Sequence, residues 1–336
     1  MRLRRVPVSI FVVIAVLAGS ELAVRAVSSK LEQPLVWVNR EAQNKVAAMD
    51  ALRRSAGGAS VAFVGSSMTQ AAVEPSLMTR LIGSKRPAFN AALDGIDMRA
   101  LEFWTLNVVV PRLKPRAVVI GLSSRELSDV GKNQRTFAKT FFASPAVKRL
   151  DGRAGRLERL EAWTEKHSYV FRYRTVLRRP ADARAIPGPT DVGPLGITRA
   201  LPAFQSRPFD ASVIFRDRIS KRVLNNYAVG KRSLASLDRI VRALDRRGIT
   251  AVIVEMPITS EAISLHPHGA TDYAAFERAM ARFIATHKVG FIPMRSSFVG
   301  TSEFVDPFHL NTAGAKRFTE LLAPRVRSAL AAAGSP

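Results

Sequence analysis

Short apolar runs alternate with amphipathic stretches from about residue 59 onwards. Five of these runs have the length and composition of buried strands: Ser60–Val64, Ala88–Ala91, Ala117–Leu122, Thr250–Glu255 and Gly290–Ile292. Helical patterns separate most of them, and strands that alternate with helices usually form a parallel sheet. We therefore predict an α/β domain over residues 59–330, built on a doubly wound parallel sheet of five strands.

The N-terminal region has a different pattern. Arg2, Arg4 and Arg5 precede an apolar run from Val6 to Ala18, and apolar residues continue it as far as Val27. Basic residues beside such a run stay on the cytoplasmic side of a membrane. No convincing small-x-small cleavage motif stands out, so we expect residues 1–28 to be an uncleaved signal anchor in the cell membrane. The N-terminus would be cytoplasmic and the remainder extracytoplasmic; the alternative is a cleaved signal and a secreted protein.

Glu21 and Arg25 interrupt the end of the apolar run one helical turn apart, where their side chains can pair near the membrane boundary. Residues 29–58 follow as a juxtamembrane stretch. We expect a helix over Asn39–Arg54, because the small residues of Ser55–Gly58 would end it.

A long insertion, from about Val130 to Tyr227, separates the third and fourth predicted strands. Leu157–Trp163 and Tyr169–Leu177 have helical patterns and many basic neighbours. An insertion of this length near a binding site would form a lid or a docking face. We interpret its aromatic residues, Trp163 among them, as packing residues.

Composition narrows the function further. The chain of 336 residues has no Cys, which excludes disulfides, thiol catalysis and a lipid-modified Cys anchor. Five His residues without a close cluster predict no metal site, and no motif calls for a cofactor. The net charge of +24 fits anionic lipid or an anionic envelope polymer, or it reflects a general bias in composition. An exported chain is not expected to bind nucleic acid.

The first candidate motif follows the first predicted strand. Gly65 permits a sharp turn after Val61–Val64, and Ser66 and Ser67 then open a helix expected to run to Leu81. Backbone N–H groups and the helix dipole favour negative charge at such a junction, which suits the oxyanion of acyl transfer. The alternative is that the two Ser residues only cap the helix.

The second candidate motif lies near the C-terminus. Asp306 and His309 are three residues apart on a turn, so one carboxylate can orient the imidazole while its other nitrogen faces outward. Ala315, Phe318, Leu321 and Leu322 predict the core face of the helix that follows. A Ser nucleophile needs a base and the base needs a partner, so the three residue types together favour catalysis.

These residues resemble the SGNH (GDSL-type) hydrolase family. Gly65-Ser66-Ser67 is similar to its Gly-Asp-Ser block, with Ser66 in place of the Asp, and this match implies that Ser67 is the nucleophile. Asp306 and His309 match the Asp-x-x-His block in full. The resemblance therefore implies a catalytic triad of Ser67, His309 and Asp306 on an SGNH or flavodoxin-like fold.

The two middle blocks of the family concern the oxyanion. Asn90–Gly95 looks like the second block, which implies that the backbone N–H of Gly95 joins that of Ser67 in an oxyanion hole. Val118–Leu127 occupies the place of the third block but has no Asn. Either Ser124 or Arg125 supplies the missing donor there, or the oxyanion hole is weaker than in the family.

The resemblance implies a serine acyl-ester hydrolase or O-acyltransferase. Members with an N-terminal anchor and a Ser-Ser block resemble envelope acylation proteins of the teichoic-acid D-alanylation and alginate-acetylation types. This implies a cell-envelope glycan or lipid-linked polymer as substrate and a membrane-bound O-acyltransferase as partner. Two alternatives stay open: a plain exported esterase with the insertion as lid, and a non-catalytic module that binds polymer or docks a membrane partner.

Overall fold

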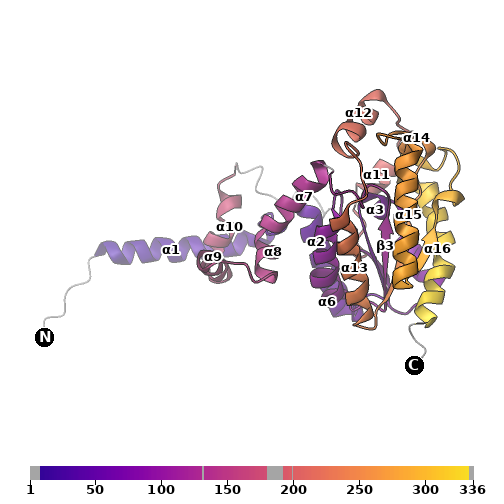
Figure 1. Cartoon of the computed structure of the whole chain (residues 1–336). Helices are drawn as coiled ribbons and strands as arrows, with labels where there is room; N and C mark the ends of the chain where they lie inside the picture. The colour runs from indigo at the N-terminus through magenta and orange to yellow at the C-terminus, as the bar shows by residue number, and fades with distance from the viewer. Residues whose placement is uncertain (1–7, 131, 180–191, 199, 333–336) are drawn as a thin grey trace. The chain divides into compact units, whose positions relative to one another are not determined.

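The computed structural model describes residues 8–130, 132–179, 192–198 and 200–332 (Figure 1). The chain divides into two compact units. The first, which we call the anchor unit, contains the residues up to Asn39 together with residues 144–190. The second, the α/β unit, contains residues 40–143 and those from 191 onwards. The insertion between the third and fourth strands is therefore shared between the two units.

Five parallel strands form the sheet of the α/β unit, in the order β2-β1-β3-β4-β5. The strands are β1 (Val61–Val64), β2 (Ala88–Asn90), β3 (Ala117–Leu122), β4 (Thr250–Glu255) and β5 (Gly290–Pro293). Every residue of β1, β2 and β3 is buried, as expected for strands covered on both faces. The predicted α/β class with a five-stranded parallel sheet is confirmed.

Helices cover both faces of this sheet. In Figure 1, α2, α6 and α13 lie on one side of β3, and α15 and α16 lie on the other. Two π- or 3₁₀-helical turns, Trp104–Val109 and Arg295–Ser297, accompany the α-helices. The α-helices are α2 (Arg40–Ala56), α3 (Ser67–Ala72), α4 (Pro75–Ile82), α5 (Met98–Phe103), α6 (Val110–Leu113), α7 (Lys132–Ala143), α11 (Leu201–Gln205), α12 (Val213–Arg222), α13 (Lys231–Asp245), α14 (Ser260–Ser264), α15 (Ala270–His287) and α16 (Thr312–Ala332).

Two helix predictions are corrected. The helix that begins at Ser67 ends at Ala72 rather than near Leu81, because Pro75 starts a separate helix, α4, after an extended break. On α16, the predicted core residue Leu321 is 41% exposed, whereas Phe318 and Leu322 are fully buried. A residue directly before Leu322 lies about a quarter turn away from it, outside the buried stripe.

A short antiparallel hairpin precedes α16. Its strands are β6 (Phe304–Asp306) and β7 (His309–Leu310), and Asp306 pairs directly with His309 across a two-residue turn. The sequence pattern predicted a turn at this point but no strand pairing. The hairpin explains the three-residue spacing, since cross-strand partners next to a two-residue turn lie side by side.

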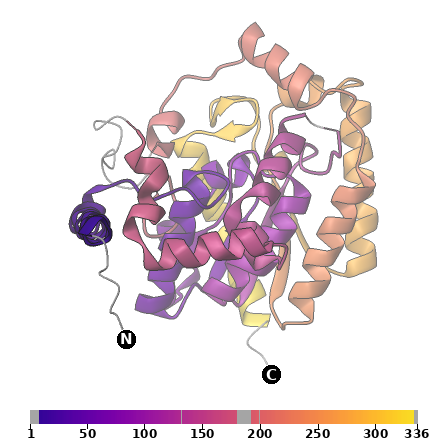
Figure 2. The same ribbon diagram turned by 90° about the vertical axis from the view of Figure 1, so that its left-hand side faces the viewer.

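The anchor unit contains α1 (Val8–Val27), a 3₁₀ turn at Ser28–Lys30, α8 (Pro145–Leu150), α9 (Arg156–His167) and α10 (Tyr169–Leu177). By length and composition α1 can cross a membrane, and none of its residues is buried in the protein. Figure 2 shows α1 end-on with α10 beside it. Leu31, Tyr173 and Val176 form a small apolar cluster between the two segments.

Candidate active site

Tight backbone packing places Ser67 at the end of β1. Gly65 has a φ of 153°, and a Cβ on it would lie 2.8 Å from the Gly121 carbonyl oxygen, so only Gly fits at this turn. Ser66 is the N-cap of α3, and its buried hydroxyl accepts a hydrogen bond from the N–H of Met68 at 3.4 Å. The capping role therefore falls to Ser66, and the hydroxyl of Ser67 is turned into an open cavity.

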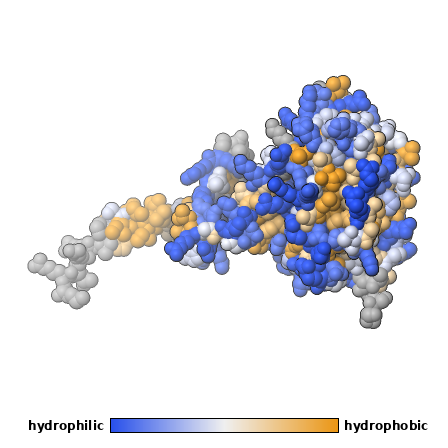
Figure 3. Space-filling model, viewed as in Figure 1, coloured by the Kyte–Doolittle hydropathy of each residue, from blue (hydrophilic) through white to orange (hydrophobic). Residues whose placement is uncertain are grey.

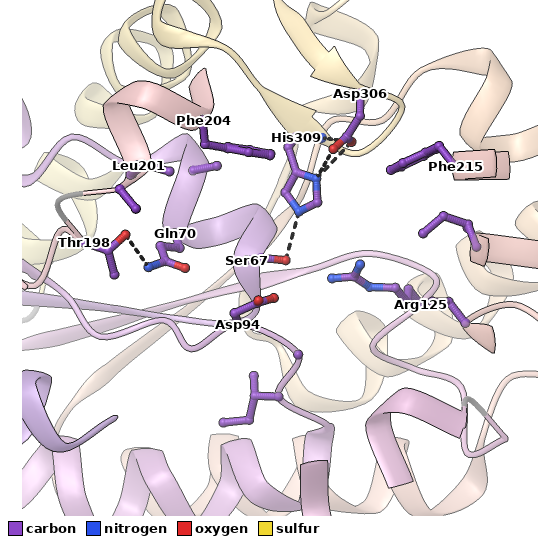
Figure 4. Close-up of a pocket in the computed structure, with 16 residues that line it drawn as sticks. Ser67, Gln70, Asp94, Arg125, Thr198, Leu201, Phe204, Phe215, Asp306 and His309 are labelled. Carbon is purple, nitrogen blue, oxygen red and sulfur yellow. Dashed lines mark hydrogen bonds and ion pairs between the residues drawn. The ribbon is translucent and has the colours of Figure 1, made fainter. Parts of the chain in front are cut away.

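The structure brings Ser67, His309 and Asp306 together in one hydrogen-bonded chain (Figure 4). His309 Nε2 lies 2.9 Å from Ser67 Oγ, and His309 Nδ1 lies 2.8 Å from Asp306 Oδ2. A carboxylate can only accept, so Nδ1 carries the proton and Nε2 is left to accept the proton of the Ser67 hydroxyl. The edge of the Phe204 ring packs on the imidazole, with 5.5 Å between ring centres.

The Asp306 carboxylate is held by its own hairpin. Besides His309 Nδ1, it accepts the backbone N–H groups of Phe308 at 2.8 Å and of His309 at 3.0 Å. Burial raises the pKa of this carboxyl, but the charge and hydrogen bond of His309 and the two N–H donors outweigh burial and hold the pKa below its ordinary value. Asp306 is therefore ionised at neutral pH and able to stabilise a protonated His309.

The cavity beside Ser67 has a volume of about 440 Å³ and two kinds of lining. Its apolar side chains come mainly from α11 and α12, both of which belong to the insertion. Its polar side chains come from α3, from the residues that follow β2 and β3, and from the insertion. The apolar lining includes Leu201, Phe204, Phe215, Ile219 and Val223, and the polar lining includes Gln70, Asp94, Arg125 and Thr198.

Gly95 lies at the edge of this cavity, in a loop supported by α2. Gly95 has a φ of 71°, a conformation that favours Gly. Glu41 accepts the N–H of the preceding Asp94 at 3.3 Å and the Gln70 amide at 2.9 Å. Lys45, fully buried, donates to the Ala92 carbonyl, and burial lowers the pKa of its ammonium although Glu41 opposes this. The sequence pattern gave no indication of the Glu41 and Lys45 support.

The structure separates the two residues considered for the third oxyanion donor. Arg125 lines the cavity, and its Nη2 donates to Ser66 Oγ at 3.0 Å and to Glu126 Oε1 at 3.1 Å. Ser124 is fully buried and is not among the residues that line the cavity. Its hydroxyl lies 2.9 Å from His266 Nε2. Of the two side chains, only that of Arg125 reaches the space in front of Ser67.

His266 holds the loop after β3 from behind. Its Nδ1 lies 3.0 Å from the Ile263 carbonyl and 3.1 Å from that of Ala262, so Nδ1 donates and Nε2 accepts the hydroxyl of Ser124. Burial lowers the pKa of His266, in spite of these carbonyls, and keeps the ring neutral. His266 is 3% exposed and therefore belongs to the interior of the α/β unit.

Glu126 is a buried site residue that the motif comparison missed. Its Oε2 accepts the N–H of Ser123 at 2.8 Å and the Ser123 hydroxyl at 2.5 Å, while Oε1 faces Arg125. Burial raises the pKa of Glu126, but Arg125 and the hydroxyls of Ser123 and Ser66 outweigh burial and hold the pKa below its ordinary value. The carboxyl therefore stays ionised. An acidic residue directly after Arg125, at the end of a buried strand, was the available signal.

Among the described residues, no group of three or more His, Asp or Glu side chains could hold a metal ion. The site offers hydroxyl, imidazole, carboxylate and guanidinium groups. Ser67, Gly95, Arg125 and the β6–β7 turn all follow the carboxyl ends of strands or adjoin them, where open α/β sheets bind ligands.

No family model matches the sequence, and no curated protein matches it significantly. Solved structures do. A protein from Bacteroides fragilis assigned as an acylhydrolase has a TM-score of 0.44 and 13% identity, covering 88% of this chain and 100% of its own. A GDSL-like lipase from Bacteroides thetaiotaomicron has a TM-score of 0.38 and 10% identity, and the match covers 84% of this chain and 98% of the lipase. A carbohydrate acetylesterase family member from Sinorhizobium meliloti has a TM-score of 0.35 and 14% identity, and the match covers 81% of this chain and 99% of that protein. Similarity at this level transfers no activity, so the function has to be argued from the site itself.

Proposed function

We propose that this protein is a membrane-anchored serine acyl-ester hydrolase or O-acyltransferase. The observation that carries the proposal is the hydrogen-bonded chain from Ser67 through His309 to Asp306, which opens on a cavity. Nε2 of His309 takes the proton of Ser67 as Oγ attacks an ester carbonyl. The tetrahedral intermediate collapses to an acyl-enzyme, and the departing alcohol takes the proton back from His309.

Three donors are available for the oxyanion of that intermediate. The backbone N–H groups of Ser67 and Gly95 supply two, and the guanidinium of Arg125 supplies the third in place of a side-chain amide. Glu126 fixes the Arg125 guanidinium by two contacts, from Nε at 3.2 Å and from Nη2 at 3.1 Å. A cation held in place before the reaction stabilises developing negative charge without reorganisation.

The lining of the cavity supports an ester with one apolar and one polar part. Phe215 and Ile219 of α12, with Val223 directly after it, offer an apolar wall, whereas Gln70 and Thr198, hydrogen-bonded to each other at 3.2 Å, offer polar groups. We extend the proposal to an acyl group on a cell-envelope glycan or lipid-linked polymer. The apolar helix α1 would hold the α/β unit outside the membrane, beside a membrane-bound O-acyltransferase, with the basic N-terminus in the cytoplasm.

The direct test is covalent labelling of the full chain in detergent with a fluorophosphonate, which reacts only with an activated Ser. We expect one adduct, on Ser67, and none in Ser67→Ala. Ser264→Ala, which removes an exposed hydroxyl on α14, should label like the wild type. Labelling that persists in Ser67→Ala, or that is absent from the wild type, overturns the proposed nucleophile.

A second measurement divides hydrolysis from transfer. The wild type is given a small activated ester with water alone, and then with added sugar hydroxyls as acceptors. Acylated sugar formed faster than free acid assigns the protein as a transferase, and free acid alone assigns it as a hydrolase. An unlabelled protein that still binds envelope polymer would instead be a binding module.

A further inference from the structure

Helix α9 of the anchor unit has large apolar side chains that the described residues leave mostly exposed. Leu157 is 78% exposed, Leu160 is 59% exposed and Trp163 is 61% exposed, and α9 contains no buried residue. The interpretation of Trp163 as a packing residue is therefore wrong; its ring lies at the surface beside that of His167, with 4.6 Å between ring centres and a tilt of 32°. Exposed apolar residues gathered on one short helix of a soluble surface point to an interaction.

Polar contacts tie α9 and α10 together as one piece. Arg174 of α10 pairs with Glu165 at 2.9 Å and with Glu161 at 3.5 Å, and Arg172 Nε donates to the Glu165 carbonyl at 2.9 Å. One residue, Ser168, connects the two helices and caps α10 through its hydroxyl. The position of α9 is therefore fixed by whatever holds α10.

Helix α10 is held by the membrane-competent helix α1. The Glu21 carboxylate of α1 accepts the Ser168 hydroxyl at 2.9 Å, the N–H of Val170 at 3.2 Å and the N–H of Tyr169. The guanidinium of Arg25 lies 5.8 Å from the centre of the Tyr169 ring. Glu21 therefore caps the N-terminus of α10, which favours a negative charge there.

This attachment sets the depth of α9 in a membrane. The uncharged stretch Val8–Ser20 is about 20 Å long as a helix, shorter than a hydrocarbon layer about 30 Å thick, so Glu21 lies in the far part of the span, within about 10 Å of its boundary. The N-terminus of α10 meets Glu21, and the last turn of α9, with Trp163, directly precedes that N-terminus. Trp163 is thereby held at the depth where Trp side chains collect in membrane proteins.

The direction of α9 agrees with this depth. Figure 1 shows α1 along its length and α9 end-on, and Figure 2 shows α1 end-on and α9 running across the view. Helix α9 therefore lies crosswise to α1. A helix that lies crosswise to a spanning helix at the membrane boundary runs along the membrane surface, the position of an interfacial helix.

The charges around α9 identify the partner. Between Arg156 and Arg179 the sequence contains seven Lys and Arg residues but three Glu residues. All three Glu side chains are paired, Glu158 with Lys148 and the other two with Arg174. In Figure 3 the apolar surface of α1 ends where the hydrophilic surface of the anchor unit begins. Apolar residues beside a surplus of basic residues match an anionic lipid surface.

We infer that α9 is an interfacial helix that inserts Leu157, Leu160 and Trp163 between the lipid headgroups at the end of α1. The inference rests on the proposed membrane anchoring, since the depth of α9 is measured from α1. It adds a second attachment to the membrane, by surface insertion rather than by spanning. Anionic lipid supplies the countercharge for the basic residues of α9 and α10.

Tryptophan fluorescence tests the inference in the full chain, reconstituted into vesicles of phosphatidylcholine and phosphatidylglycerol. Trp37 and Trp104 are buried, so Trp163 is the exposed Trp among the described residues. Lipids brominated near the headgroup end of their acyl chains should quench the wild type, and Trp163→Phe should remove most of that quenching. Equal fractional quenching in the two proteins overturns the inference.

A labelling experiment uses the absence of Cys from the chain. Leu160→Cys and the control Leu321→Cys, on an exposed position of α16, are treated in vesicles with a membrane-impermeant maleimide. We expect Leu160→Cys to react several-fold more slowly than Leu321→Cys; equal rates overturn the inference. Extraction of the same vesicles with alkaline carbonate separately tests the anchor. If the protein resists extraction but the two variants react at equal rates, the proposed anchor stands and the interfacial helix is overturned. If the protein is extracted, both proposals are overturned.

Discussion

The two units of this protein are stabilised in different ways. The α/β unit buries whole strands, and Phe63, Phe89 and Trp104 are among its largest fully buried side chains. The anchor unit has a small apolar cluster around Tyr173 and depends on carboxylates such as Glu21 for the attachment of α10. The stability of the α/β unit is spread over many buried apolar side chains, so removing one surface charge should change it little. The attachment of α10 depends on one carboxylate, so removing that charge should weaken it.

This difference suggests that the two units have separate tasks, catalysis in one and membrane attachment in the other. The residues proposed for catalysis lie in the α/β unit, on rigid strand ends and a tight hairpin. The residues proposed for membrane contact lie in the anchor unit, where charges and exposed apolar groups determine their position. Substitutions should therefore affect one property at a time, and four experiments test this separation.

The largest effect is expected at His309. His309→Gln removes the base, and turnover should fall by about 10³-fold or more, because Ser67 then keeps its proton. Membrane attachment of the full chain should not change. Initial rates with a small ester measure the loss, and His268→Gln, which alters an exposed ring, is the control. Near-normal turnover in His309→Gln would mean that another group acts as base.

A smaller loss is expected at Arg125. Arg125→Met removes the proposed third oxyanion donor and should lower kcat by about 10²-fold with little change in KM. Glu126→Gln leaves the guanidinium but removes the negative charge of its partner, so the loss of kcat should be smaller. Arg325→Met on the exposed side of α16 serves as control. An Arg125→Met enzyme with unchanged kcat would leave the oxyanion to the two backbone N–H groups.

The comparison can be tested from the other side at Glu21. Glu21→Leu makes α1 more apolar but removes the acceptor at the N-terminus of α10, which should cost about 1–2 kcal/mol of local stability. Hydrogen exchange of the amides of residues 168–177 should become faster, while ester turnover stays the same. Glu320→Gln on α16 is the control. Loss of turnover in Glu21→Leu would show that the two properties are coupled.

The smallest effect concerns pH and His266. Its pKa is lowered in the folded protein, so below the ordinary value of about 6.5 the unfolded chain binds a proton that the folded chain does not. Stability is therefore full above that pH and decreases as pH falls toward the folded pKa. His266→Gln should lack this decrease, a difference on the order of 1 kcal/mol or less between pH 7 and 5 by urea unfolding. His268→Gln should behave like the wild type, and a parallel loss in His266→Gln would contradict the assignment.

The strands of the fold could be predicted because each is a local apolar run bounded by turn residues. The approach of Ser67 to Asp306 and His309 could be anticipated from motif order, although the pairing of β6 with β7 could not, since two strands of three and two residues give little periodicity. Pro75 is the sequence signal for the break before α4, although the helical pattern continues on both sides of it.

Contacts between residues distant in sequence could not be predicted. Nothing near Glu21 indicates a partner 147 residues later, and nothing near Ser124 indicates His266. The same limit explains Trp163, because an aromatic residue on an amphipathic helix fits a core or a membrane surface equally well from its pattern. Only the position of α10 on α1 separates the two.

The capping of α10 by Glu21 also has a consequence during synthesis. Glu21 leaves the ribosome 147 residues before Ser168, which at about 5–20 residues per second is a delay of roughly 7–30 s. If α1 is the proposed membrane anchor, it enters the membrane in that interval before the backbone N–H groups of α10 are there to donate to the Glu21 carboxylate. A proton, water or lipid headgroups would then satisfy Glu21 until α10 emerges, and docking of α10 would be a late step in the insertion of α1.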